Sequence, residues 1–247
     1  MSILELLNNP EQYRLGPNFR GSSRVFPVQL NKEKYIVKQP KIVPLACIIE
    51  FYYYIQDRIL IEHQLLPPSE RLTHEAKKLA HLNKYNLNVP TIAAYNKRTL
   101  VRQYLNGFSF HELSEKEQKS CLDKALETML AIHDHDIYIG DAHVKNIFLS
   151  QDKAYWLDFD TVYTEKDKAK AADLVKFIYS TYTVTRNSEL TLSLAELVTT
   201  YKLPLSTLNH LKELTLRLTP NIWLWFFARI PVTSNIPSQI NRILTSS

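Results

Sequence analysis

The chain has 247 residues, a net charge of +5 and a pI near 9.0, and 45% of its residues are hydrophobic. This apolar content is enough for a sizeable core and argues against a disordered chain. Two widely separated cysteines without CxxC spacing exclude a cysteine-built metal site. The positive charge favours anionic partners such as nucleotides, acidic glycolipids or lipid headgroups, but the basic residues are dispersed, so nucleic acid is an unlikely partner.

The N-terminus lacks a basic segment followed by an apolar core, so we predict no signal peptide. The longest apolar stretch, residues 44–61, contains three charged residues and would span a bilayer poorly. We therefore expect a cytoplasmic protein, with the inner face of the membrane as an alternative location.

Residues 16–38 predict a glycine-containing turn followed by strands that end at Lys38. The backbone amides of Gly21, Ser22 and Ser23 are candidates for binding phosphate oxygens, because small residues leave the backbone accessible. An ordinary β-turn is the alternative. A strand lysine such as Lys38 can neutralise the α- and β-phosphates of a nucleotide if a carboxylate fixes it.

Residues 69–83 predict a helix with Ser69 as N-cap and apolar residues on one face. Glu75 lies at the border of that face, so we expect it to pair with Lys38. An additional helix is predicted at about 45–60, where Phe51 and three following tyrosines indicate buried aromatic packing or a substrate surface.

Strands are predicted at residues 91–95 and 99–104. The segment after them is expected to be a hinge, whose backbone at Gln103, Tyr104 and Leu105 would bind an adenine edge. A helix over residues 114–133 should follow, with Ser114 and Glu117 forming a capping box.

Residues 139–160 combine Asp141, Asn146, a predicted hairpin and Asp158 in the order that a phosphoryl-transfer site requires. Asp141 would accept the proton of an attacking hydroxyl, and Asn146 and Asp158 would bind Mg²⁺. We refer to residues 139–146 as the catalytic loop and to residues 158–161 as the metal-binding loop. A surface hairpin flanked by solvated acids is the alternative. Asp160 is interpreted as a turn residue, with a second metal ligand as the other possibility.

Three further features follow the hairpin. Asp173, on a helix around residues 171–178, either braces the catalytic loop or is solvated. His143 and Lys145 are candidates for contacting the γ-phosphate or the acceptor, whereas His133 and His135 are expected to be structural. Helices are predicted at 190–201 and at 206–218, the second capped by Ser206, and the aromatic residues 223–227 near Arg229 indicate core packing or a membrane-surface contact.

These residues, in this order from Gly16 to Leu174, resemble a small atypical kinase-like family. The chain is similar to the bacterial lipopolysaccharide (Kdo/heptose) kinases and to the compact kinase of the tRNA-threonylcarbamoylation complex. The resemblance implies an α+β, bilobal protein-kinase-like fold, with a small β-rich N-lobe over about 1–105 and a mainly helical C-lobe over 106–247. It also implies ATP and Mg²⁺, with Asp141 as catalytic aspartate.

The chain departs from the family in having Ile139 where a histidine usually precedes the catalytic aspartate, which puts a hydrogen bond to the metal-binding loop in doubt. The Asp-Phe-Asp sequence and the absence of an Ala-Pro-Glu element favour a sugar or glycolipid acceptor over a peptide. A protein kinase or partner-stimulated ATPase within a complex is the alternative, and a nucleotide-binding pseudokinase scaffold is the second alternative.

Overall fold

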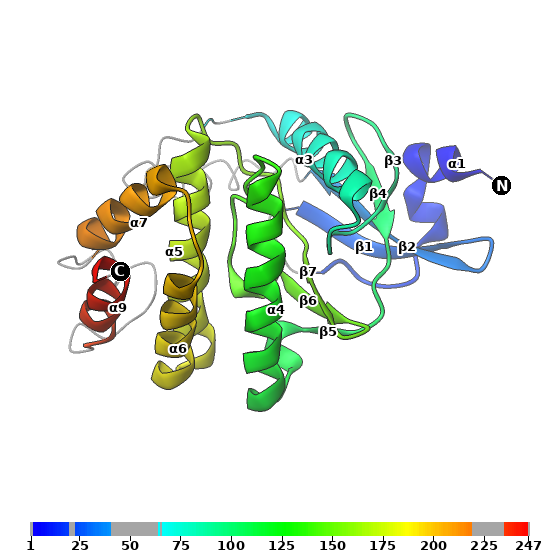
Figure 1. The fold of residues 1–247 in the computed structure, drawn as a ribbon. Coiled ribbons are helices and arrows are strands. Elements are labelled where there is room, and N and C mark those ends of the chain that lie inside the picture. The colour runs from blue at the N-terminus through cyan, green and yellow to red at the C-terminus, as the bar shows by residue number, and fades with distance from the viewer. Residues whose placement is uncertain (1, 20–22, 41–63, 65, 219–234, 247) are drawn as a thin grey trace.

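The computed structural model describes residues 2–19, 23–40, 64, 66–218 and 235–246. Figure 1 shows a β-rich part with α1 and α3 at one end and a helical part at the other, with α4 and a second small sheet between them. This is the α+β arrangement that the sequence predicts. The predicted helix at 45–60, the turn residues Gly21 and Ser22, and the aromatic residues 223–227 with Arg229 lie outside the described residues.

The first sheet is antiparallel, with the strand order β1-β2-β4-β3. Its strands are β1 (Ser23–Leu30), β2 (Glu33–Pro40), β3 (Ile92–Tyr95) and β4 (Leu100–Gln103). Asn31 and Lys32 join β1 to β2 with positive φ at both positions, which matches the right-handed twist of a hairpin. Apolar side chains of this sheet pack against Leu6 of α1 (Ile3–Asn8), which is followed by η1 (Pro10–Tyr13).

Helix α3 (Pro68–Leu82) buries an apolar face that contains Leu72, Ala76 and Leu79, as its periodicity predicts. The predicted N-cap is wrong, because the helix begins at Pro68 and Ser69 lies inside its first turn. Proline is favourable at that position, since the first helical residue needs no N–H partner. The helix continues into η2 (Asn83–Tyr85).

The second sheet has the order β5-β6-β7, formed by β5 (Phe108–Ser109), β6 (Ile147–Ser150) and β7 (Lys153–Trp156). Strands β6 and β7 are the predicted hairpin. It packs on α4 (Glu115–Asp134), where buried Trp156 donates its indole N–H to Ala125 O at 2.9 Å. The predicted capping box of Ser114 and Glu117 is present and fixes where α4 begins.

The remaining helices complete the larger part of the molecule. They are α5 (Lys166–Thr185), α6 (Ser188–Thr200), α7 (Leu205–Leu218) and α9 (Ile236–Thr245), with the short η3 (Phe110–Glu112) and η4 (Val144–Asn146). Helix α7 begins at Leu205, so the predicted cap Ser206 is inside the helix. Among the described residues, no helix is both long and apolar enough to cross a membrane.

Candidate active site

Lys38 of β2 lies at the centre of the site and is 4% exposed. Its Nζ donates to Glu75 Oε2 at 2.6 Å and to Asp158 Oδ1 at 2.8 Å. It also lies 3.4 Å from Asp160 Oδ2. The pair that the sequence predicts between Lys38 and Glu75 is therefore present, and one ammonium joins the first sheet, helix α3 and the segment after β7.

The charges of this cluster shift one another's pKa values. Burial lowers the pKa of Lys38, but the attraction of its three carboxylate neighbours more than offsets burial and raises that pKa overall. Burial raises the pKa of Glu75 to about 7 against the attraction of Lys38. Burial and the neighbouring Asp158 also raise the pKa of Asp160. Burial is thus the main cause of both raised carboxyl pKa values, and the neighbouring carboxylates add to it.

The donor atoms fit Mg²⁺. Within the described part of the chain, ligand oxygens of Glu75, Asp158 and Asp160 all lie within 4.8 Å of one another. Among the same residues, Glu75 Oε1 accepts no hydrogen bond, and Arg102 Nη1 is 3.5 Å from it. Carboxylate oxygens are the ligands that Mg²⁺ prefers. This geometry favours the ligand interpretation of Asp160 over the turn interpretation.

The catalytic loop holds Asp141 beside Asn146. Asn146 Nδ2 donates to the backbone O of Asp141 at 2.8 Å and to its Oδ2 at 2.9 Å. Leu157 N donates to Asn146 O at 3.0 Å, so Asn146 and Asp158 stand at neighbouring strand ends, as the hairpin predicts. Lys145 Nζ lies 3.5 Å from Asp141 Oδ2.

The pKa of Asp141 is lowered although burial acts to raise it, because Lys145, Lys176 and His143 offset burial. Burial and the positive charge of Lys145 lower the pKa of His143 to about 4, so this imidazole is neutral near pH 7. His143 also caps η4, since its Nδ1 accepts from Lys145 N at 3.2 Å.

Asp173 of α5 braces the catalytic loop, which decides between the two interpretations of this residue. Its carboxylate is fully buried and accepts from Ile139 N at 2.7 Å and from Gly140 N at 2.8 Å. His133 Nε2 lies 3.1 Å from Asp173 Oδ2, so His133 is structural, as predicted. His135 is also in a packing contact, stacked on Tyr85 at 3.8 Å between ring centroids.

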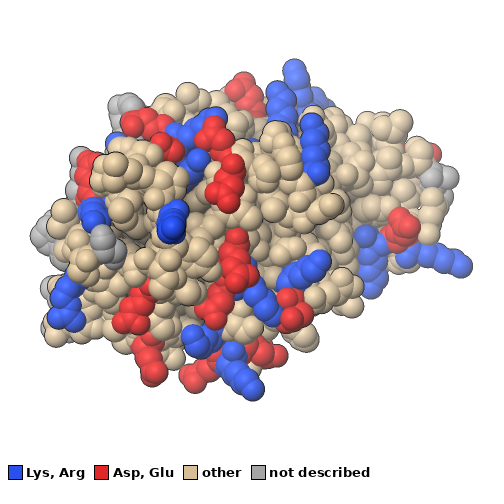
Figure 2. Space-filling model, in the orientation of Figure 1, with Lys and Arg blue, Asp and Glu red and all other residues tan. Residues whose placement is uncertain are grey.

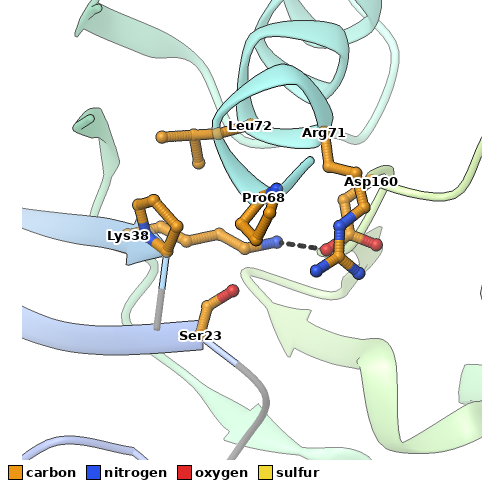
Figure 3. Close-up of a pocket in the computed structure, with 7 residues that line it drawn as sticks. Ser23, Lys38, Pro68, Arg71, Leu72 and Asp160 are labelled. Atoms are coloured by element: carbon orange, nitrogen blue, oxygen red, sulfur yellow. Dashed lines mark hydrogen bonds and ion pairs between the residues drawn. The ribbon is translucent and has the colours of Figure 1, made fainter. Parts of the chain in front are cut away.

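A small pocket lies beside Lys38, between the ends of β1 and β2 and the start of α3. Figure 3 shows Lys38 reaching Asp160 across it, with the side chain of Arg71 next to Asp160. The pocket is lined by Ser23, Lys38, Pro40, Pro68, Arg71, Leu72 and Asp160. Ser23, one of the three residues predicted to bind phosphate, thus lines this pocket.

The predicted hinge follows β4. Gln103 donates its backbone N–H to Thr91 O at 2.8 Å, which takes that N–H away from any adenine. Tyr104 lies next to β2, with Lys34 Nζ 5.5 Å from its ring centroid. Gly107 is tightly placed, because a Cβ there would lie 2.0 Å from Leu149 O. The glycine therefore allows the segment after the hinge to pass close to β6.

Sequence reasoning missed two buried cations of the site. Lys78 of α3 donates to Tyr138 O at 3.2 Å and to Thr161 O at 3.0 Å. Arg102 of β4 donates to Leu157 O directly before Asp158. Lys78 follows Glu75 by three residues on α3, so helical periodicity could have predicted that both side chains lie on the same face. The alternation of residues in a strand could not have predicted that Arg102 contacts Leu157.

Comparison with known proteins shows what the chain is similar to. Residues 67–176 match the RIO domain family, a segment that contains Glu75, the catalytic loop and Asp158. A probable bifunctional tRNA threonylcarbamoyladenosine biosynthesis protein of Methanosphaera stadtmanae is 28% identical over 120 residues, which are 47% of this chain and 22% of that protein. The chain thus matches less than a quarter of this relative's length.

Two solved structures share the fold over nearly the whole chain. WaaP, solved in complex with acyl carrier protein, has a TM-score of 0.51 at 12% identity and covers 97% of this chain and 91% of its own. The Rio2 kinase of Chaetomium thermophilum, solved as an ADP/Mg²⁺-phosphoaspartate complex, has a TM-score of 0.52 at 11% identity, with 98% and 74% covered. The predicted resemblance is confirmed. The chain therefore has a protein-kinase-like fold, and it resembles the RIO domain family over residues 67–176.

Proposed function

We propose that the chain transfers the γ-phosphoryl group of ATP to an acceptor hydroxyl, and that the acceptor is a sugar or a glycolipid. The observation that carries the phosphotransfer proposal is the buried Lys38, whose Nζ donates to Glu75 at 2.6 Å and to Asp158 at 2.8 Å. This is the pairing that orients nucleotide phosphates in kinases.

Each residue would have a distinct task. Asp141 would accept the proton of the acceptor hydroxyl, since its pKa is lowered and it is ionised near pH 7. Lys38 would neutralise charge on the α- and β-phosphates, held by Glu75. Asn146 Oδ1, Asp158 and Asp160 would hold Mg²⁺, because Asn146 Nδ2 is already engaged with Asp141. When bound, Mg²⁺ would neutralise negative charge that develops on the phosphates.

The nucleotide would lie between the first sheet and the catalytic loop. Ser23 at the pocket supports phosphate binding by the turn before β1, with Gly21 and Ser22 as its other predicted members. Tyr104 and Leu105 are the proposed adenine contacts, because the backbone N–H of Gln103 is used within the sheet. Lys145 and His143 flank Asp141 and are proposed to contact the γ-phosphate or the acceptor.

The short connection after Asp160 supports a small acceptor. Helix α5 begins at Lys166, so only residues 161–165 stand where protein kinases place a long peptide-docking segment. On the face in Figure 2, Lys and Arg are interspersed with Asp and Glu. We propose a cytoplasmic location, and a glycolipid acceptor would bring the chain to the membrane surface.

A protein-directed kinase or partner-stimulated ATPase is the second candidate. It is favoured by the 28% identity to a protein named for threonylcarbamoyladenosine biosynthesis on tRNA. A pseudokinase scaffold would have little need for the buried cluster of Lys38, Glu75 and Asp158.

The acceptor is tested by offering γ-labelled ATP and Mg²⁺ to the wild type, with cell lipid extract and protein extract in parallel. Asp141→Asn removes the proposed base, and Asp152→Asn is a matched control in the exposed β6–β7 turn. Label in a lipid or saccharide fraction with the wild type and Asp152→Asn, but not with Asp141→Asn, supports our proposal. Label on protein alone supports a protein-directed kinase, and no label on either fraction contradicts our proposal of a sugar or glycolipid acceptor.

A further inference from the structure

Lys78 connects helix α3 with the two loops that carry Asp141 and Asp158, and the proposed chemistry requires these three parts to keep fixed positions relative to one another. It lies on α3 three residues after Glu75 and is 8% exposed. Its Nζ donates to Tyr138 O at 3.2 Å and to Thr161 O at 3.0 Å, and lies 3.9 Å from the centroid of the Tyr138 ring. Tyr138 precedes the catalytic loop, and Thr161 directly follows Asp160.

This arrangement is costly in the interior of a protein. Burial lowers the pKa of Lys78 to about 8, although Asp173, Asp160, Glu75 and Asp158 act to raise it. Its Nζ donates hydrogen bonds to the neutral carbonyl oxygens of Tyr138 and Thr161, which stabilise an ammonium less than carboxylates do. A Met or Leu would fill a buried helix position at lower cost. A buried cation that bonds to two separate loops therefore indicates a positional role.

The role is indicated by the surroundings of the catalytic loop. Ile139, two residues before Asp141, has an apolar side chain that is fully buried in the core and can donate no hydrogen bond to the segment 158–161. Its backbone N–H is held by Asp173, which fixes the catalytic loop to α5 but not to the segment 158–161. Lys78 supplies a link between these two loops from a different element.

We propose that Lys78 is a positioning residue that holds the catalytic loop against the metal-binding loop and couples both to the Lys38–Glu75 pair through helix α3. This inference rests on the proposed phosphotransfer function. Residues three positions apart lie on the same helix face, so a shift of α3 displaces Glu75 and Lys78 together. Such a shift would break the Lys38 pair and release both loops in one step.

The test uses Lys78→Met, which keeps the length of the side chain and removes its donors, and Lys78→Arg, which restores donors and charge. Lys77→Met is the matched control, because Lys77 is the exposed neighbour on the same helix. Two readouts are needed. The first is kcat and the KM for ATP, and the second is hydrogen exchange of residues 138–146 and 157–163 relative to the rest of the chain.

We expect Lys78→Met to lower kcat by about 10- to 100-fold with little change in the KM for ATP, as for residues that orient a catalytic group. Exchange should become faster in both loops and not in α6 or α9. Lys78→Arg should recover part of kcat, and Lys77→Met should behave as wild type. Wild-type kcat in folded Lys78→Met, or exchange that rises equally everywhere, would overturn the proposal.

The experiment distinguishes a failure of this inference from a failure of the proposed function. If the wild type transfers no phosphate, the exchange experiment still tests the link between the loops. If Lys78→Met does not fold, native-state exchange of the wild type in low denaturant decides, because linked loops must open together with the same free energy. Separate opening of the two loops would contradict the proposal.

Discussion

At the scale of single residues, the buried Asp173 fixes the geometry of the catalytic loop. Its two oxygens accept from two consecutive backbone amides and one of them contacts His133. The side chain has no exposed surface. The carboxylate thereby holds the backbone of the catalytic loop in place from α5.

We predict that Asp173→Asn lowers the free energy of unfolding by about 2–3 kcal/mol, because an amide nitrogen would face one of the two backbone donors. Urea denaturation measures the change. Asp167→Asn, on the same helix but less buried, should cost less than about 0.5 kcal/mol. Equal effects of the two substitutions would contradict the bracing role.

The lowered pKa of Lys78 predicts a pH dependence of stability. The folded pKa is about 8 and the ordinary value is 10.5, so between these values the unfolded chain binds more protons at residue 78 than the folded chain. The free energy of unfolding of the wild type, relative to Lys78→Met, should therefore rise from pH 8 to 10.5, by at most about 3 kcal/mol. Denaturant titrations of both proteins across this range measure the difference, and a constant or falling difference would be the wrong sign.

A contact between two site residues could be predicted from the sequence where the proposed chemistry requires both of them. Lys38 and Glu75 were predictable because a strand lysine at phosphates needs a carboxylate, and helix periodicity places Glu75 on the inner face. The sequence favours a turn role for Asp160 and predicts no role for Arg102, because an acid after a short strand and an arginine within a strand are both often exposed to solvent. Only the packing of three elements around Lys38 distinguishes a position in the site from exposure to solvent.

At the scale of elements, the catalytic loop is shaped by Gly140. Its φ is +96°, a conformation that side chains rarely adopt, and an added Cβ would lie 2.8 Å from Thr161 Cβ. The loop therefore approaches the segment after Asp160 more closely than any other residue type would permit. Together with the two hydrogen bonds of Lys78, this contact keeps the two loops adjacent.

Gly140→Ala should destabilise the protein by about 2–4 kcal/mol, because backbone strain and the clash with Thr161 add. Gly16→Ala is the control, since its Cβ would meet Pro27 Cγ at an ordinary 3.7 Å. Thermal unfolding of both variants gives the comparison. Similar melting temperatures would show that Thr161 can move away without cost.

Element types were predictable from periodicity, and several boundaries were not. The capping box of Ser114 and Glu117 gave the start of α4 correctly, because both partners are local in the sequence. Helix α3 began one residue before its predicted cap, since Pro68 is itself a favourable first residue. Helix α5 extends well beyond the predicted 171–178, because its burial depends on α6 and α7, which local pattern cannot reveal.

At the scale of the whole molecule, the site is assembled from distant parts of the chain. Lys38 lies on the first sheet, Glu75 on α3, and Asp158 after the second sheet, so their contact depends on how these elements pack (Figure 1). A nucleotide that bridges them should bind the folded chain and stabilise it as a unit. The acceptor could not be predicted, because acceptor pockets are formed by helices and loops without a portable motif.

Saturating Mg·ATP should raise the melting temperature of the wild type by about 5–10 °C, from roughly 2.7 kcal/mol of binding linkage at 100 times Kd. Lys38→Met should lose most of this shift, whatever its own melting temperature, because its phosphate contact is gone. Lys119→Met, on the exposed side of α4, should keep the shift. Equal shifts in all three proteins would place the nucleotide elsewhere.

The measurement that tests the central claim most directly is Mg²⁺-dependent turnover of γ-labelled ATP, counting transfer to any acceptor and to water. Asp158→Asn removes a charge from the Lys38 cluster, whereas Asp152→Asn changes the exposed hairpin turn of the same sheet. We predict that Asp158→Asn loses at least about 100-fold in rate while Asp152→Asn keeps the wild-type rate. Unchanged turnover in Asp158→Asn would contradict the assignment of this cluster as the phosphotransfer site.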